Sequence, residues 1–338
     1  MSNPPTLKSI AQRVGMTANT VSLALRDSPL VAENTKARIQ KAAEEMGYVQ
    51  NAIAGSLRSG RTNTVAVVMG DIANPLFAAK IKALEHVLRE EGYQIIIFNS
   101  DEDPQRELEA VRTAISRKVD GLVLCPCADP EEALKLLNRH GVPCVLSGRM
   151  DQAGNQDIVL WNDWQGGYLA ASHLLECGCR RIAWLGVTQR ISSARDRKNG
   201  YLAALKEAEI APDPALVAEA SPTGGDVGQV LRPLLAQGVD GICAFSDLIA
   251  WEAACFLEEI GLHVPGDIQL TGFDDVADHL RIPYRLTSVS ADLEREAREL
   301  VHLLLLRLHE PDRPVTITKI ETELVVRGST RPLGNKGR

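Results

Sequence analysis

The chain has 338 residues, 45% of them hydrophobic, with seven cysteines and a net charge of −7. No apolar run reaches the roughly 20 residues that a membrane-spanning helix needs, and the N-terminus shows no positive stretch followed by an apolar one, so we expect neither a membrane protein nor a signal peptide. The odd number of cysteines, mostly in apolar runs, fits a reducing, cytoplasmic setting, and the length suits two or three compact units.

The first predicted elements are two short helices joined by a tight turn, within Thr6–Arg26. Thr6 is placed to cap the first helix, Gly15 to end it at a positive φ, and Thr17 to cap the second. So short a joint makes the helices cross steeply, as in a helix-turn-helix. The second helix offers short polar groups and methyls of the kind that read base edges in a major groove, at Thr17, Ala18, Asn19, Thr20 and Ser22. Most amphipathic helix pairs do not bind DNA, so this pattern alone does not decide the function.

A third amphipathic helix is predicted over 33–46. The segment that follows, 48–60, is too apolar for a linker and too short to be a stable helix by itself. Residues 1–62 hold eight Lys or Arg and four Asp or Glu, a net charge of +4, so the rest of the chain carries −11. A basic head on an acidic body places any DNA affinity in the head.

From Thr64 onward, short apolar strands alternate with helical patterns such as 75–91 and 247–260. The predicted strands are 64–69, 94–98, 121–125, 143–146, 181–185, 241–245 and 268–272. Apolar strands separated by helices are typical of parallel sheets buried on both faces. The predicted fold is an N-terminal all-α helix-turn-helix head plus an α/β core of two doubly wound parallel-sheet lobes. Ligands of such sheets bind beyond the carboxyl ends of the strands, which here means a cleft between the lobes.

Six sequence runs carry a family resemblance. They are TLKSIAQRVGMTANTVS at 6–22, GYVQN at 47–51, AGSL at 54–57, NPLF at 74–77, HLL at 173–175 and GFDD at 272–275. In these runs, which follow one another along nearly the whole chain, it resembles the lac/purine repressor (LacI) family of bacterial transcription regulators. The resemblance implies a periplasmic-binding-protein-like core whose lobes close on a small molecule.

We expect the domain boundaries to follow the same plan. The head is 1–50, the hinge helix or linker 51–62, and the core, which binds the effector and dimerises, 63–338. Within the core, lobe 1 is predicted at about 63–162 and 291–322, and lobe 2 at about 163–290 and 323–338.

In the head, the candidate DNA contacts are Thr6, Thr17, Ala18, Asn19, Thr20 and Ser22. Asn19 is the best candidate for a bidentate contact to adenine, and Thr20 and Ser22 suit phosphates or base edges. Leu23 stands where many relatives carry arginine. Leucine can touch a thymine methyl but cannot grip guanine or phosphate, so the preferred operator is expected to differ from the family's common one.

The resemblance also implies that residues 51–59 become helical on DNA. Leu57 would then wedge into the minor groove at the operator centre, bending the duplex, although anchoring against the core is the alternative. Asn51 and Ala54 belong to the same hinge segment, and Arg58 can reach backbone phosphates. A two-fold homodimer on a palindromic operator is expected.

The candidate effector contacts follow predicted strands. Asp71 is a candidate because it follows the first strand, and the resemblance implies roles for Phe77, Arg197, Ser246 and Asp275. Each could instead have a purely structural role: Phe77 as a helix-start residue that covers the core, Arg197 as a solvated charge, and Asp275 as a helix cap. Ser246 replaces the asparagine of many relatives, which shortens its reach, and Arg195 is close enough to Arg197 to be confused with it. Trp161 offers an aromatic face for a sugar, with core packing as the alternative. A sugar or sugar phosphate is the favoured effector, and a nucleobase or nucleoside acting as corepressor is the second choice.

Other function classes have weaker support. The motifs GxGxxG, HExxH and GxSxG and the P-loop pattern do not occur, so an α/β enzyme is the less favoured alternative. The pairs Cys125/Cys127 and Cys177/Cys179 are spaced too closely for usual zinc sites, and no metal or cofactor is expected. A secreted binding protein would need a signal peptide and would not need residues 1–60. The sequence therefore predicts a DNA-binding transcription regulator, a repressor controlled by a small molecule.

Overall fold

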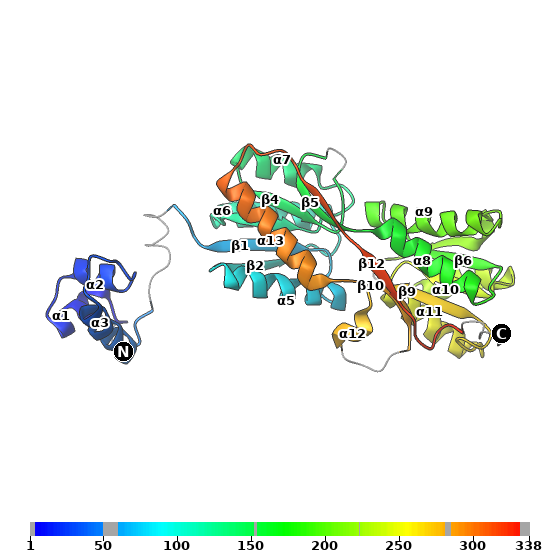
Figure 1. The fold of residues 1–338 in the computed structure, drawn as a ribbon, viewed down its shortest axis with the longest axis horizontal. Coiled ribbons are helices and arrows are strands. Elements are labelled where there is room, and N and C mark those ends of the chain that lie inside the picture. The colour runs from blue at the N-terminus through cyan, green and yellow to red at the C-terminus, as the bar shows by residue number, and fades with distance from the viewer. Residues whose placement is uncertain (1–3, 50–59, 152–153, 223, 281–284, 332–338) are drawn as a thin grey trace, which may run out of the picture. The chain divides into compact units, whose positions relative to one another are not determined.

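The computed structural model describes residues 4–49, 60–151, 154–222, 224–280 and 285–331, which belong to two units, 1–62 and 63–338 (Figure 1). The first unit has three helices: α1 (Leu7–Val14), α2 (Ala18–Ala24) and α3 (Glu33–Glu45). They enclose a small core whose buried side chains include Ile10, Val21 and Ile39. The unit therefore has the helix-turn-helix and the third helix that the sequence predicts.

Local chemistry fixes the joint of the helix-turn-helix. The Thr6 hydroxyl accepts from the Ser9 amide at the start of α1. Gly15 ends this helix at φ 66°, a left-handed conformation that glycine adopts without strain. Thr17 then caps α2 by accepting from the Thr20 amide at 3.1 Å. Caps of this kind stabilise a helix by about 1 kcal/mol each, so the turn is strongly specified by its sequence.

The second unit contains two six-stranded sheets, each the centre of a lobe. Lobe 1 has the strand order β11 (Ile317–Ile320), β5 (Asp157–Trp161), β4 (Cys144–Ser147), β3 (Gly121–Leu124), β1 (Thr64–Met69) and β2 (Gln94–Asn99). Lobe 2 has the order β12 (Thr322–Val325), β10 (Thr287–Ala291), β9 (Gln269–Phe273), β8 (Gly241–Ala244), β6 (Ile182–Val187) and β7 (Val217–Ala220). Neighbouring strands are parallel except for β10 and β12, which pair antiparallel.

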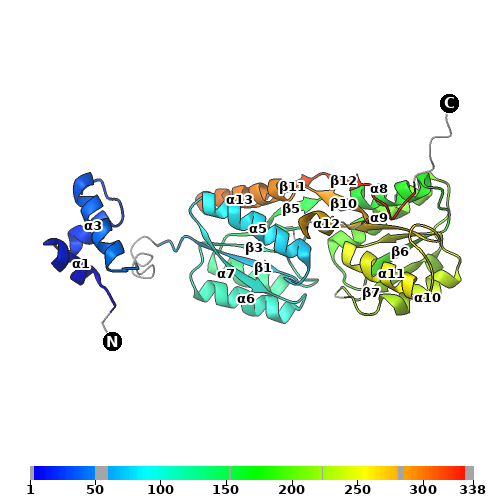
Figure 2. The same ribbon diagram turned by 90° about the horizontal axis from the view of Figure 1, so that it is seen from below.

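Helices cover both faces of each sheet, as Figure 2 shows. In lobe 1 they are α5 (Pro75–Glu90) and α13 (Leu293–His309) on one face and α6 (Pro104–Ser116) and α7 (Glu131–His140) on the other. In lobe 2 they are α8 (Asp163–Glu176) and α9 (Ser192–Glu207), and opposite them α10 (Val227–Ala236) and α11 (Asp247–Glu259). The short helix α12 (Val276–Leu280) and the 3-10 turn Pro214–Leu216 complete the lobe. Double coverage explains why the central strands are continuously apolar.

The chain passes between the lobes three times: between β5 and α8, between β10 and α13, and between β11 and β12. Two of these crossings are bonded to each other, because the Asn162 amide donates to the Ile320 carbonyl at 2.8 Å. The Thr322 hydroxyl also donates to the Asn162 carbonyl, at 3.3 Å. Multiple bonded crossings limit the lobes to hinge motion.

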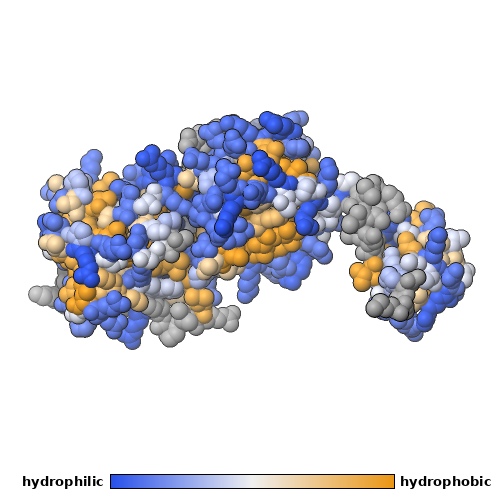
Figure 3. Space-filling view, turned by 180° about the vertical axis from the view of Figure 1, so that it is seen from behind, coloured by the Kyte–Doolittle hydropathy of each residue, from blue (hydrophilic) through white to orange (hydrophobic). Residues whose placement is uncertain are grey.

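The strands of mixed polarity escaped prediction. VAEA of β7 and TSVSA of β10 lack the continuous apolar run by which the seven predicted strands were recognised. None of the helices in the described ranges is long and apolar enough to cross a bilayer. Figure 3 shows one face of the molecule, on which hydrophobic residues form separate patches among hydrophilic ones.

Candidate functional site

In the first unit, the candidate DNA-reading residues lie on or next to α2. Asn19 is exposed, and Ala18, Thr20 and Ser22 are half-buried. The hydroxyls of Thr17 and Thr20 lie 2.9 Å apart, so the cap partly uses the polar groups that were assigned to DNA. Asn19 is therefore the side chain of this helix with the most freedom to meet a base edge.

The thymine contact of Leu23 stays a prediction. Leu23 is half-buried and packs against the core of the three helices. The predicted hinge contacts Asn51, Ala54, Leu57 and Arg58 lie outside the described residues. They remain predictions.

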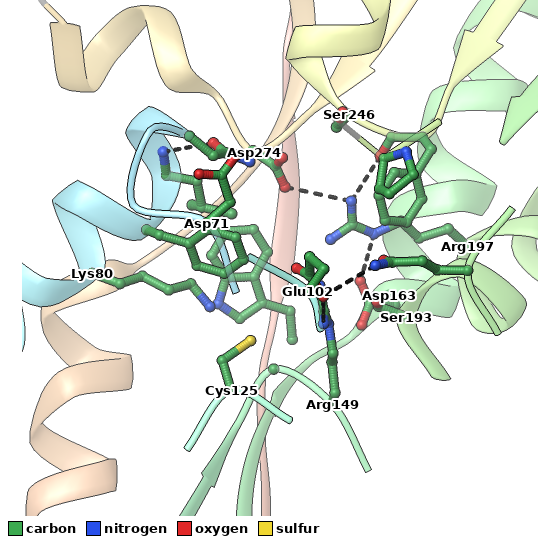
Figure 4. A pocket seen from close by; sticks show the side chains of 18 residues that line it. Asp71, Lys80, Glu102, Cys125, Arg149, Asp163, Ser193, Arg197, Ser246 and Asp274 are labelled. Atoms are coloured by element: carbon green, nitrogen blue, oxygen red, sulfur yellow. Dashed lines mark hydrogen bonds and ion pairs between the residues drawn. The ribbon is translucent and has the colours of Figure 1, made fainter. Parts of the chain in front are cut away.

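In the second unit, side chains from both lobes line one cavity, which we call the interlobe pocket. It has a volume of about 730 Å³ including its open mouth. Its lining residues are Asp71, Asn74, Leu76, Phe77, Lys80, Glu102, Cys125, Gly148, Arg149, Trp161, Asp163, Gln189, Ser193, Arg197, Pro222, Phe245, Ser246 and Asp274. Figure 4 shows these side chains converging from the two lobes.

Strand ends supply most of this lining. In lobe 1, Asp71 follows β1, Arg149 follows β4 and Trp161 ends β5. In lobe 2, Ser246 follows β8 and Asp274 follows β9. The carboxyl ends of parallel strands thus face one another across the pocket, as expected for a ligand site in such sheets.

Arg197 is the main cation of the lobe 2 wall. Its side chain is 7% exposed, and its Nε donates to Asp163 at 2.7 Å. One terminal nitrogen donates to the Phe245 carbonyl at 2.7 Å and to Asp274 at 3.4 Å. The guanidinium also lies 3.5 Å from the ring centroid of Phe273. This planar group is held by carboxylates and aromatic faces together, which fixes its orientation in the pocket.

The two carboxylates beside Arg197 are both buried. Burial raises the pKa of Asp163, and the nearby Arg197 charge opposes that rise. Burial likewise raises the pKa of Asp274 to about 6, again against the opposing charge of Arg197. Asp274 therefore changes its charge near neutral pH.

The lobe 1 wall holds two further cations, each with its own carboxylate. The Lys80 ammonium lies 2.8 Å from Glu296 of α13. Arg149 forms a two-pronged pair with Glu102, with nitrogen–oxygen distances of 2.6 and 2.8 Å. Gln189 of lobe 2 donates to the same Glu102 carboxylate at 3.2 Å, so this pair also ties the lobes together.

Five of the six predicted effector residues line the interlobe pocket: Asp71, Phe77, Trp161, Arg197 and Ser246. Trp161 is only 4% exposed, and its ring stacks on Phe273 with a centroid distance of 6.1 Å. Its ring is therefore mostly covered by protein atoms. Little of the ring face is left for a sugar to stack on.

Asp275 is the exception, because it is not among the lining residues, and its contact with the effector stays a prediction. The Asp275 carboxylate pairs with Arg327 at 2.7 Å, and its amide donates to Ser288, whereas Asp274 lines the pocket. Both residues have positive φ, 100° at Asp274 and 49° at Asp275, and of the two only Asp274 lines the pocket. Of the two neighbouring arginines, Arg197 lines the pocket, whereas Arg195 is exposed and pairs with Asp196.

Several pocket residues were missed by sequence reasoning. They are Lys80, Glu102, Arg149, Asp163, Gln189 and Asp274. Asp163 and Gln189 follow strands and could have been found by that rule, but Lys80 lies on a helix face with no such signal. Among the described residues, no group of three His, Cys, Asp or Glu side chains is placed to hold a metal ion.

Comparisons with known proteins agree with this architecture. Residues 6–51 match the family of bacterial regulatory proteins, lacI family, and residues 171–330 match a periplasmic binding protein-like domain. The regulator GalR of Escherichia coli strain K12 is 32% identical over 89% of this chain and 88% of its own. The chain belongs to the LacI family. It is accordingly a DNA-binding transcription regulator with a ligand-binding core, and its relatives are regulators and not enzymes.

Other members give the same result. The repressor PurR of Vibrio atlanticus strain LGP32 is 28% identical over 97% of this chain and 99% of its own. A complex of the regulator CelR with cellobiose is 30% identical, covers 96% of this chain and 99% of its own, and has a TM-score of 0.72. The lac repressor dimer bound to operator and an anti-inducer shares the fold, with a TM-score of 0.83 at 22% identity over 97% of this chain and 99% of its own.

Proposed function

We propose that this regulator represses transcription as a homodimer on a palindromic operator, and that a neutral sugar in the interlobe pocket changes its operator binding. The observation that carries the proposal is the pocket itself, where hydrogen-bonding side chains of both lobes converge at the strand ends. A ligand that contacts both lobes favours one degree of closure over others, which is the differential binding that allosteric control requires. Because the target is the chromosome, we place the regulator in the cytoplasm.

The charges of the pocket support a neutral sugar over a sugar phosphate. The lining cations Lys80, Arg149 and Arg197 are each paired with a carboxylate. A phosphate would have to displace one of these buried carboxylates, which is costly. Sugar hydroxyls, by contrast, both donate and accept, so they suit a wall of paired carboxylates and guanidinium groups.

Two similar structures strengthen the choice of a sugar. The CelR structure contains cellobiose, and a LacI-family regulator from Enterococcus faecium, 26% identical with a TM-score of 0.71 over 80% of this chain and 99% of its own, contains ribose. Phe77 and Phe245 add apolar surface beside the polar groups, as sugar sites require.

We further propose that the head reads the operator through α2, with Asn19 as its main base-reading side chain. The hinge segment at 51–59, with Asn51, Ala54, Leu57 and Arg58, would then follow the family plan of a minor-groove wedge. Two copies of the head suit the two half-sites of a palindrome.

A ligand screen tests the proposal. Purified regulator is melted with neutral mono- and disaccharides, their phosphates, nucleosides and nucleobases, because a ligand of the folded state raises the melting temperature. Hits are measured by calorimetry, and operator binding is then repeated with and without each hit. A neutral sugar that binds and changes operator affinity supports the proposal. A response limited to nucleobases or to sugar phosphates would refute the sugar assignment.

A further inference from the structure

Glu296 is a buried carboxylate that the ligand would not touch. It lies in the first turn of α13, is 1% exposed, and is not among the side chains that line the interlobe pocket. Its Oε1 accepts from the Lys80 ammonium at 2.8 Å and from the Ser147 hydroxyl at 2.9 Å. Its Oε2 accepts from the Trp161 indole nitrogen at 2.7 Å. Both oxygens are thus occupied by donors from three different elements.

Two of those donors belong to the pocket wall. Lys80 and Trp161 both line the pocket, and the Lys80 ammonium lies 4.6 Å from the centroid of the Trp161 ring. A side-chain carbon added at Gly148, itself a lining residue, would lie 3.4 Å from the same ammonium. The positive charge therefore sits at the inner surface of the wall, and its counter-charge sits behind the wall.

From this geometry we infer that Glu296 determines the charge preference of the interlobe pocket. The inference rests on the proposed function, in that it explains why the proposed effector is neutral. With Glu296 in place, the Lys80 ammonium already has a carboxylate partner and has little to gain from an anionic ligand. Without that carboxylate, the ammonium needs a counter-ion in a water-poor site, and the pocket side is the one open to a ligand.

The other pocket cations are less suitable for such a role. The carboxylates that neutralise Arg149 and Arg197 line the pocket themselves, so the ligand meets cation and carboxylate together. Only at Lys80, among the described lining residues, does the partner carboxylate lie outside the lining. A single substitution behind the wall can there change the charge offered to the ligand without removing a side chain that touches it.

The test uses Glu296→Gln, which keeps the size of the side chain and removes its charge. The double variant Lys80→Met/Glu296→Gln is the matched control, because it has the same change at 296 but no cation. Full-length wild type and both variants are melted with inorganic phosphate, and their affinities for glucose and glucose 6-phosphate are measured by calorimetry. Inorganic phosphate reports on the exposed charge whichever sugar is the natural effector.

We expect Glu296→Gln to bind phosphate or glucose 6-phosphate at least about tenfold more tightly than wild type, the size of one charged hydrogen bond. The double variant should lose this gain. If Glu296→Gln gains no anion affinity over wild type, or if the double variant gains as much, Glu296 is only a structural partner and the inference is overturned.

The proposed function fails by a different result. It fails if wild type binds no neutral sugar of the larger panel, whatever the variants do with phosphate. Should Glu296→Gln prove too unstable to purify, Glu296→Asp provides a second route. Its carboxylate is shorter by one carbon and keeps the negative charge, so it should retain wild-type exclusion of phosphate, and a gain of anion affinity there would also count against the inference.

Discussion

Replacing Arg197 by leucine should separate effector control from DNA binding. The substitution removes a guanidinium that is 7% exposed and leaves the carboxylates of Asp163 and Asp274 without their closest cation. Breaking a buried ion pair by removing one partner costs about 3–5 kcal/mol. The cost falls toward the lower end here, because the pKa values of both carboxylates are already raised and they can take up protons.

A loss of about 3 kcal/mol would lower the melting temperature of the core by about 10 °C, since each kcal/mol shifts a domain of this size by about 2–4 °C. Effector affinity should fall at least about thirtyfold, because a buried charged donor is lost from the site. Operator affinity at 20 °C should stay close to wild type, since the helix-turn-helix belongs to a separate unit. Melting is followed by circular dichroism, effector binding by calorimetry and operator binding by fluorescence anisotropy.

Arg195→Leu is the matched control for this experiment. It removes the same type of side chain two residues away, from an exposed pair with Asp196 that is worth below about 1 kcal/mol. The control should melt, bind effector and respond like wild type. An Arg197→Leu protein that melts within about 2 °C of wild type and keeps its effector affinity would show that the pairing with Asp163 does not organise the pocket.

Three further predictions follow from other parts of the molecule. Asp274 has a pKa of about 6 and accepts ligand hydroxyls best when it is ionised, so sugar affinity measured by calorimetry should fall from pH 7.5 to 5.5. The ordinary pKa of an aspartate is 3.8, so the contribution of Asp274 to folding stability is lost as pH rises from about 4 to 6. Thr17→Ala should cost the head about 1 kcal/mol by melting, and weaken operator binding, while a Thr17→Ser protein stays near wild type. A Cβ at Gly200 would overlap the Trp164 carbonyl, so Gly200→Ala should lower the melting temperature and the effector affinity, and an unchanged melt would contradict this packing.

The sequence predicted those parts of the molecule whose cause is local. Strands such as 64–69 are buried on both faces and therefore appear in the sequence as apolar runs. The turn at Gly15 could be predicted from the residues that cap the helices on either side of it. Since ligands of parallel sheets lie beyond strand ends, finding the strands already placed Asp71 and Ser246 in the pocket. Local signals therefore gave the lobes and the approximate position of the site.

Contacts between distant residues could not be predicted in the same way. Lys80 and Glu296 are 216 positions apart, and each reads as one more charge on an amphipathic helix. Asp274 and Asp275 both have a positive φ that no residue type in the sequence requires, so the sequence did not show that Asp274 lines the pocket. Such pairs become visible only when the sheets bring them together.

The pocket lining and the hinge are adjacent at the first crossing between the lobes. Trp161 precedes Asn162 and Asp163 follows it, and both of these neighbours line the pocket. The Asn162 backbone is in turn bonded at both its amide and its carbonyl to the third crossing. A ligand that moves Asp163 through Arg197 thus acts within one residue of the hinge. Coupling from the pocket to lobe closure needs no long chain of side chains, because two lining residues directly flank the residue that bonds the crossings together.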